Sequence, residues 1–150
     1  MIRRSSALRA WRGGLVAGLL LAGSPAFAAD IDPFAVAGPW LTRGGDSIVR
    51  FDACGTGWCG RIAKVLHRDP KSALTDIKNP DPALRSHPIE GLQILHLTTR
   101  DPTTWRGTVY DPRSGRTWTV YVHRTAARHL EVKGCLAFLC QAQDWVAAEG

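Results

Sequence analysis

The chain has 150 residues, 45% of them hydrophobic, and a formal net charge of +6 at pH 7. This length fits one domain with a small core, and the sequence shows no internal repeat and no low-complexity segment. No apolar run approaches the roughly 20 residues that a membrane-spanning helix needs, so we expect no stable membrane anchor. The basic residues are scattered rather than clustered, so we expect no nucleic-acid partner.

The first 28 residues have the three parts of a secretory signal peptide. Four arginines precede an apolar run over residues 15–22, and residues 26–28 read Ala-Phe-Ala, which is typical of a cleavage site. Cleavage there leaves 122 residues with 15 basic and 13 acidic side chains, a net charge of +2. We therefore predict one β-barrel domain over residues 29–150, located in the periplasm or secreted.

The rest of the chain is expected to form short strands separated by turns. Residues 116–124 alternate strictly, with Trp118, Val120 and Val122 set against polar neighbours, which is the period of a half-buried strand. The preceding Asp111-Pro112-Arg113-Ser114-Gly115 has Asp, Pro and Gly where a hairpin turn requires them. The other expected strands cover 38–42, 47–53, 60–66, 92–99, 105–110, 129–134 and 141–147. Eight short strands favour an all-β fold, an antiparallel up-and-down barrel that closes on itself.

The cysteines form two pairs with the same spacing, Cys54 with Cys59 and Cys135 with Cys140. In an oxidising compartment, four cysteines indicate two disulfides with three possible connectivities. A gap of four residues across a tight hairpin brings two Cα atoms near the distance that a disulfide needs, so we favour pairing within each pair. The alternatives are crossed pairings between the first and last strands, or a zinc site, for which the spacing is also suitable.

Residues 67–90 differ in kind from the expected strands. They include four prolines and few apolar residues, so they cannot form a strand and are not expected to form a long helix. A loop of 24 residues inside a compact domain is uncommon and is often functional.

Four polar residues lie within ten positions of this loop: Asp76, Asn79, Asp81 and Arg85. One interpretation is structural, because Asn and Asp beside prolines form Asx-turns that hold an irregular segment in shape, and Arg85 can pair with an aspartate. The other is binding, and we name these four residues as candidate ligand-binding residues. Their oxygens are of the kind that binds Ca²⁺, but the glycine and the terminal glutamate of an EF-hand loop are missing, so we predict no metal site.

Several motifs resemble known proteins. Gly38-x-Trp40 resembles the opening motif of lipocalins and other calycins. Further stretches resemble a bacterial family of exported proteins of unknown function with a lipocalin-like barrel. They are Gly38-Pro-Trp-Leu41, Cys59-Gly-Arg-Ile62, Asn79-Pro-Asp-Pro82, Leu84-Arg85 with Pro88-Ile-Glu-Gly91, Tyr110-Asp-Pro112 with Gly115, and Gly134-Cys135. The resemblance runs from about residue 38 to residue 145 and implies a fold and an exported address, but no established activity.

The chain departs from this family pattern near its end. The family's chains tend to end with Trp followed two residues later by Arg, and calycins commonly stack a late Arg on the opening Trp. Here the residue two places after Trp145 is Ala147. Either another arginine, such as Arg124 or Arg50, covers Trp40, or the base of the barrel is closed differently.

Barrels of eight strands either fill with side chains or hold one small ligand. Tyr110 and Trp118 are the best candidates for a pocket lining, because each lies on a central strand near a turn. His96 and His123 lie on expected strands and could meet inside a barrel with Asp76, but no motif of a catalytic site is present. We therefore predict no catalytic residues and no cofactor.

The main functional hypothesis is an exported protein that binds an apolar or amphipathic small molecule inside the barrel. The loop over residues 67–90 would act as its lid or rim, which predicts an internal cavity with a mouth near that loop. The alternative is a protein–protein interaction module of the cell envelope, such as an inhibitor of an exported hydrolase. Its contact surface would be the loop segment 76–85 or the unusually apolar turn 136–139.

Overall fold

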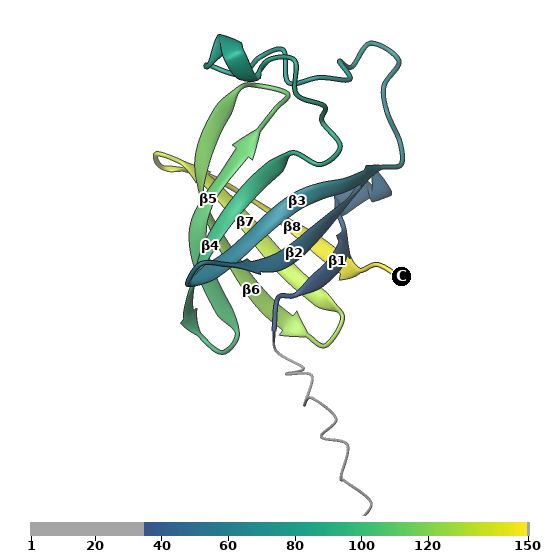
Figure 1. Cartoon of the computed structure of the whole chain (residues 1–150). Coiled ribbons are helices and arrows are strands. Elements are labelled where there is room, and N and C mark those ends of the chain that lie inside the picture. The colour runs from purple at the N-terminus through teal and green to yellow at the C-terminus, as the bar shows by residue number, and fades with distance from the viewer. Residues whose placement is uncertain (1–34, 150) are drawn as a thin grey trace, which may run out of the picture. The chain divides into compact units, whose positions relative to one another are not determined.

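The structure, a computed structural model, describes residues 35–149. Eight antiparallel strands follow one another around a closed barrel, in which the last strand pairs with the first (Figure 1). The strands are β1 (Gly38–Leu41), β2 (Ser47–Cys54), β3 (Gly57–Val65), β4 (Gln93–Asp101), β5 (Thr104–Asp111), β6 (Arg116–Ala126), β7 (His129–Leu136) and β8 (Leu139–Ala147). The predicted fold class and strand count are confirmed. The predicted signal peptide, residues 1–28, lies outside the described residues.

Alternation along the strands builds the core. In β6, Val120 and Val122 are fully buried while Thr119 and Tyr121, between and beside them, point away from the barrel axis. The same alternation on the other strands places one cluster of apolar side chains inside the barrel. Its members are Val36, Trp40, Val49, Phe51, Leu95, Leu97, Trp105, Val120, Val122, Leu130, Val132 and Trp145. Each fully buried side chain of this size stabilises the fold by roughly 1.5–3 kcal/mol.

Because the strands alternate in direction, their connections gather at two ends of the barrel. We call one the loop end; it carries the β1–β2 connection with the short helix η1 (Arg43–Gly45), the long β3–β4 loop, the β5–β6 turn and the β7–β8 turn. The other end, called the base, carries the β2–β3, β4–β5 and β6–β7 turns and the beginning of β1. In Figure 1 the long loop rises above the strands at the loop end.

The seam between the first and last strands is short. Strand β1 pairs with β8 at two positions only, Trp40 with Ala147 and Leu41 with Val146. Toward the loop end, residues 139–145 of β8 pair with β7 but with no second strand of the described chain. The six residues from 139 to 144 are all exposed. The β8 edge is therefore free at the loop end, although the barrel is closed at the base.

The long β3–β4 loop is ordered by its own hydrogen bonds. The Asp76 N–H donates to the His87 carbonyl at 2.9 Å, and the short helix η2 (Pro82–Leu84) lies between these two residues. Gly115 in the β5–β6 turn has a φ of +70°, and a Cβ at this position would overlap the Lys78 carbonyl oxygen. Glycine thus allows the turn to pack closely against the loop. The prediction of an irregular segment over residues 67–90 is confirmed.

Both favoured disulfides are present. Cys54 is bonded to Cys59 with a Cα–Cα distance of 5.7 Å, and Cys135 to Cys140 with a Cα–Cα distance of 4.0 Å. The first staples the β2–β3 hairpin at the base and the second staples the β7–β8 hairpin at the loop end. The crossed pairings considered above are therefore wrong.

Candidate functional site

The base of the barrel is sealed by one tryptophan and one arginine. Trp40 is 2% exposed, and its indole N–H donates to the Val36 carbonyl at 2.8 Å. The guanidinium carbon of Arg124 lies 5.2 Å from the centre of the Trp40 ring, within the range of a cation–π contact. Arg124 also donates hydrogen bonds to three backbone carbonyls around the base. These belong to Ala35, Ala126 and Ala127.

This arrangement resolves the alternatives left by the sequence. Arg124, from the end of β6, covers Trp40 in the absence of an arginine after Trp145. Arg50, the other candidate, instead pairs with Asp52 at 3.3 Å on the outer surface of β2. The base is thus a structural closure, so a site inside the barrel would open at the loop end.

A polar network fixes the long loop to the barrel wall. Asp76 is fully buried, and its two carboxylate oxygens accept hydrogen bonds from the Tyr110 hydroxyl and the Asn79 amide, each at 2.7 Å. Asn79 in turn accepts from the Asp81 N–H at 2.9 Å, and its carbonyl accepts from Arg85 Nε at 2.8 Å. Burial, with the hydrogen bond to Asp76, raises the pKa of Tyr110 to about 12. The polar groups of the network therefore hold the loop in shape. Arg85 contributes by donating to the Asn79 carbonyl, and not by the expected pairing with an aspartate.

The six candidate ligand-binding residues do not meet in one place. Asp76, Asn79, Asp81, Arg85 and Tyr110 belong to the network just described. In the β5–β6 pair, Trp118 lies opposite Val109. Tyr110 follows Val109 on the strand and therefore points to the other face of the sheet. Tyr110 and Trp118 therefore cannot line the same pocket, and only Trp118 is directed into the barrel.

The inward-facing side chains change character from base to loop end. At the level of Val109, the inward surface of β4 is still buried, because Leu95 is 1% exposed. On β5 to β8, the inward residues nearest the base, such as Trp105 and Val122, are buried, whereas those nearest the loop end are not. We call this second group the upper inner face. It consists of Val109, Trp118, Gly134, Leu136, Gln141 and Gln143. Gln141 and Gln143 share a face of β8 with the buried Trp145, yet both are exposed, because the β8 edge is free here.

Trp118 lies at the centre of this surface. Its ring is above Gly134, where an added Cβ would be 3.9 Å from Cε3 of the indole. Its indole nitrogen is buried and donates to no group of the described chain. By contrast, the indole N–H of Trp145 donates to the Gln143 side chain at 3.2 Å. A buried N–H without an acceptor is destabilising by roughly 1–3 kcal/mol, so an acceptor that reached this nitrogen would offset that cost.

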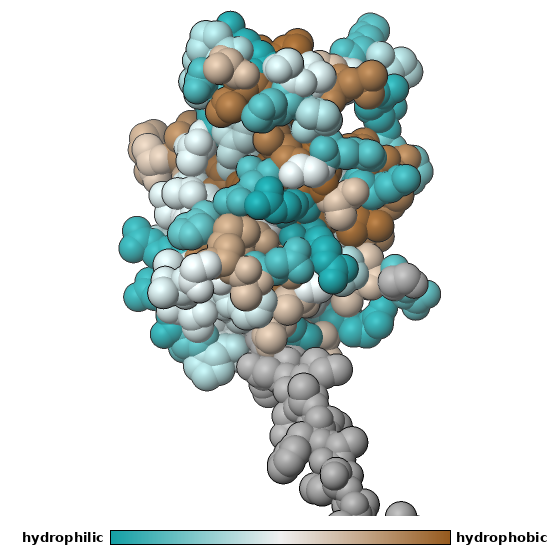
Figure 2. Space-filling model, viewed as in Figure 1, coloured by the Kyte–Doolittle hydropathy of each residue, from teal (hydrophilic) through white to brown (hydrophobic). Residues whose placement is uncertain are grey.

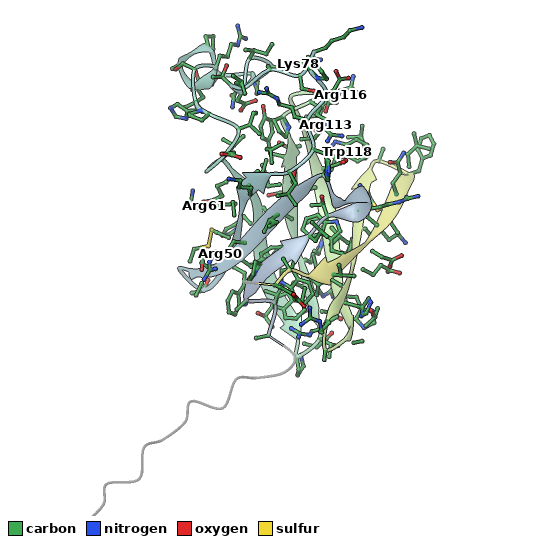
Figure 3. The ribbon with its side chains drawn as sticks, turned by 90° about the vertical axis from the view of Figure 1, so that its right-hand side faces the viewer. Arg50, Arg61, Lys78, Arg113, Arg116 and Trp118 are labelled. Carbon is green, nitrogen blue, oxygen red and sulfur yellow. A yellow bond between two sulfur atoms is a disulfide. The ribbon has the colours of Figure 1, made fainter. Side chains whose placement is uncertain are left out.

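Positive side chains surround the same end of the barrel. Figure 3 shows Lys78, Arg113 and Arg116 at the loop end near Trp118. Arg116 precedes Trp118 by two residues on β6 and so shares its face. Arg113 lies 3.9 Å from the Asp46 carboxylate and thereby links the β5–β6 turn with the β1–β2 connection. Cationic groups thus lie next to the apolar and amide groups of the upper inner face.

Two surface depressions lie outside the barrel. One, of about 390 Å³, is lined by Arg61 and residues 87–93 beside the end of the long loop. The other, of about 500 Å³, lies between outward side chains of β5, β6 and β7, with Arg106 and Tyr121 in its lining. Neither is the internal cavity expected from the sequence.

The expected meeting of two histidines inside the barrel is wrong. His96 and His123 are exposed, because each lies between inward residues of its strand and therefore points outward. Ligand atoms of His96, Cys54 and Cys59 lie within 4.8 Å of one another. The two sulfurs are joined in a disulfide, and metal binding requires thiolates, so the oxidised protein does not present this group as a metal site.

Three residues of this region, Gln141, Gln143 and Arg116, were not predicted from the sequence. A signal for them was present, since odd-numbered residues of β8 share a face with Trp145, and Arg116 shares a face with Trp118. Polar residues at inward positions of a strand indicate a solvated interior. The prediction of these strands used their apolar residues, and the polar residues at inward positions were overlooked.

The eight strands form an antiparallel meander, and an arginine over the opening tryptophan closes it at the base. This arrangement is a lipocalin-like barrel. The structure is similar to protein HP1028 from the human pathogen Helicobacter pylori, which is described as belonging to the lipocalin family. The two share 19% identity over 77% of this chain and 84% of that chain, with a TM-score of 0.67. At this identity the likeness shows the fold.

The chain belongs to a bacterial family described as "Uncharacterized protein conserved in bacteria (DUF2147)", whose model matches residues 38–147. This confirms the resemblance seen in the sequence. A search of curated proteins gives no match. Among the described residues, no helix is long and apolar enough to cross a bilayer. The two disulfides fit an oxidising compartment such as the periplasm or the cell exterior.

Proposed function

We propose that this protein binds a small amphipathic molecule on the upper inner face, with an acidic head group directed toward Arg116. One observation carries the proposal. On β5 to β8 the inward surface is packed near the base, but toward the loop end it presents the exposed amides of Gln141 and Gln143 and the Trp118 indole, whose N–H has no acceptor among the described residues. If these groups served only the stability of the fold, we would expect them to be buried and hydrogen-bonded within the chain.

The chemistry of the surface indicates the class of ligand. Val109, Leu136 and the Trp118 ring offer apolar contact, and the indole N–H and the two glutamine amides offer hydrogen bonds. Arg116 and Lys78 have no ion pair among the described residues. Few and well-placed polar groups on an apolar wall are typical of small-molecule sites. The long loop forms the rim, and the Asp76–Tyr110 contact keeps that rim in place.

Native mass spectrometry and fluorescence titration test this proposal with two matched probes, dodecanoate and dodecanol. The protein is recovered from outside the cytoplasm of expressing cells, and its N-terminus is sequenced, which also tests the predicted signal peptide. We expect dodecanoate to bind more tightly than dodecanol and to change tryptophan emission. Binding of neither probe by either method would overturn the proposal.

Two substitutions assign the binding to the upper inner face. Trp118→Phe keeps an aromatic ring but removes the N–H, and should weaken dodecanoate binding by roughly tenfold or more. Arg116→Ala should weaken the binding of dodecanoate and leave that of dodecanol unchanged. Arg100→Ala, at the base end of β4, is the matched control for charge. If the control weakens binding as much as Arg116→Ala, the head group is held elsewhere.

The alternative function, an interaction module or inhibitor, stays a prediction that rests on the apolar β7–β8 turn. Phe138 in this turn is 90% exposed, and Leu139 is 63% exposed. The protein partner that this hypothesis requires would be recovered by crosslinking in the cell envelope through a photoreactive residue in place of Phe138.

A further inference from the structure

The exposed apolar side chains are concentrated at one end of the molecule. Within residues 35–149, six of the seven exposed large hydrophobic residues lie at the loop end, so their placement is not an even scatter over the surface. They are Leu66, Leu74, Ile77 and Leu84 on the long loop, and Phe138 and Leu139 at the β7–β8 turn. Figure 2 shows apolar side chains over the long loop in brown, at the top of the view. The seventh residue, Val146, lies near the other end of β8.

The β7–β8 turn is not shaped for the stability of the chain itself. Ala137 has a φ of 52°, a left-handed conformation that favours glycine, and the next residue is the most exposed apolar side chain described. The disulfide between Cys135 and Cys140 braces the turn. An apolar tip that stays exposed to solvent adds no hydrophobic stabilisation to the fold. Such exposure indicates contact with another apolar phase.

The positive and negative side chains around these apolar tips differ in the contacts that they make. Lys71, Lys78 and Arg116 have no ion pair among the described residues. The acidic groups nearby accept hydrogen bonds from backbone N–H groups and keep their negative charge. Asp69 accepts from the Lys71 N–H, Asp81 from the Ala83 N–H, Asp111 from the Arg113 N–H, and Glu90 from the Val65 N–H. The loop end therefore presents three cationic side chains without an ion pair among the described residues, next to its apolar tips.

From this combination we infer that the loop end docks reversibly on an anionic lipid bilayer. The apolar tips enter the interfacial region, and the cationic side chains lie against anionic head groups. Binding of this kind increases with buried apolar area and with attraction to anionic lipids. It needs no transmembrane segment, and it does not depend on what the upper inner face binds.

A bilayer suits this surface better than a protein partner does. The apolar side chains come from two separate segments, the long loop and the β7–β8 turn, and project as tips. A specific protein interface buries roughly 800 Å² on each partner as one complementary patch. A fluid lipid surface accepts separate tips without shape complementarity, and its negative head groups match the unpaired lysines.

Vesicle co-sedimentation tests the inference with the secreted or periplasmic form of the protein. Vesicles of phosphatidylglycerol and phosphatidylcholine are compared with vesicles of phosphatidylcholine alone, without added small ligand. We expect binding to the anionic vesicles that weakens as salt is raised, and little binding to the neutral ones. The absence of binding to anionic vesicles at low salt would overturn the inference and would leave the proposed ligand site untouched.

Matched variants locate the contact. The pairs Leu74→Ser with Ile77→Ser and Phe138→Ser with Leu139→Ser should each weaken vesicle binding about tenfold, because each removes two inserted side chains. Lys71→Glu with Lys78→Glu should weaken it at least as much. Val146→Ser and Arg100→Glu, away from the loop end, are the controls, and circular dichroism checks the folding of every variant.

The outcomes separate the two possible partners. If the loop-end pairs lose no more vesicle binding than the controls, docking through this surface is wrong. The inference is also wrong if these pairs abolish crosslinking to an envelope protein while vesicle binding is unchanged, since the surface would then serve a protein partner.

Discussion

The two ends of the barrel are made from the same strands but are finished in opposite ways. At the base, a charged residue is used to close the core, because Arg124 covers Trp40 and donates to the surrounding backbone carbonyls. At the loop end, apolar residues are exposed, and among the described residues Lys71, Lys78 and Arg116 have no ion pair and the Trp118 indole N–H has no acceptor. The base is therefore optimised for the stability of the fold, and the loop end keeps groups that are available for contact with other molecules.

The largest effect is expected at the base. Arg124→Ala removes the cation–π contact with Trp40 and leaves several carbonyls without a donor, so it should lower the free energy of unfolding by about 3 kcal/mol. Arg50→Ala is the matched control, because Arg50 is exposed and pairs only with Asp52; its cost should be about 0.5 kcal/mol or less. Denaturation in urea measures both. Equal costs would show that Arg124 does not close the barrel.

The second prediction concerns the contact that holds the rim of the loop end. Tyr110→Phe removes the hydrogen bond to the buried Asp76 and should cost about 2 kcal/mol. Tyr121→Phe, on the outer face of β6, is the matched control and should cost little. Protection of loop amides in hydrogen exchange should fall in the Tyr110 variant alone. Unchanged protection would mean that the loop is held by its backbone hydrogen bonds.

The raised pKa of Tyr110 gives this contact a pH dependence. The pKa is about 12 in the folded protein, above the ordinary value of 10.0, so the folded state holds the phenolic proton more tightly. The contribution to stability is complete below pH 10 and is lost as the pH rises through the folded pKa. The wild-type protein should therefore lose stability relative to the Tyr110→Phe variant in this alkaline range. Parallel unfolding curves from pH 9 to pH 12 would contradict the assignment.

The sequence was sufficient for the fold because the fold is specified locally. The alternation around Val120, the chemistry of the turn ending at Gly115 and the spacing of the cysteines each act over fewer than ten residues. For the closure of the base, the sequence left two alternatives open: another arginine over Trp40, such as Arg124 or Arg50, or a different kind of closure. That decision depends on which side chain reaches Trp40 across the barrel, and this is a long-range property.

The candidate site was predicted less well than the fold, because the pairing register of the strands decides which side chains face inward. Tyr110 and Trp118 both lie near a turn on central strands, and the sequence analysis placed them in one pocket. The pairing of Asp111 with Arg116 puts Tyr110 opposite Thr117, so the tyrosine faces away from Trp118. A shift of one residue in pairing exchanges the two faces of a strand. Apolar or aromatic character alone therefore could not tell which side chain enters the barrel.

The smallest expected effect compares the two disulfides, which have the same separation of five residues. Equal loops constrain the unfolded chain equally, by roughly 2 kcal/mol. The hairpins differ in the folded state, because Cys59 is 7% exposed and its strand pairs with β2 and β4, whereas Cys140 is exposed on the free edge of β8. Without its disulfide, the β7–β8 tip should open locally while the barrel stays folded. The folded state then gains conformational entropy, which offsets part of the entropy that the unfolded chain gains.

We therefore expect replacement of Cys54 and Cys59 by Ala to lower the free energy of unfolding by about 2 kcal/mol, and replacement of Cys135 and Cys140 to lower it by about 1 kcal/mol. Hydrogen exchange should show faster amide exchange over residues 136–141 in the second variant only. If both pairs cost the same and exchange at the tip is unchanged, the β7–β8 turn is as firmly held as the base. The disulfide at the loop end would then not be what presents Phe138 to a membrane.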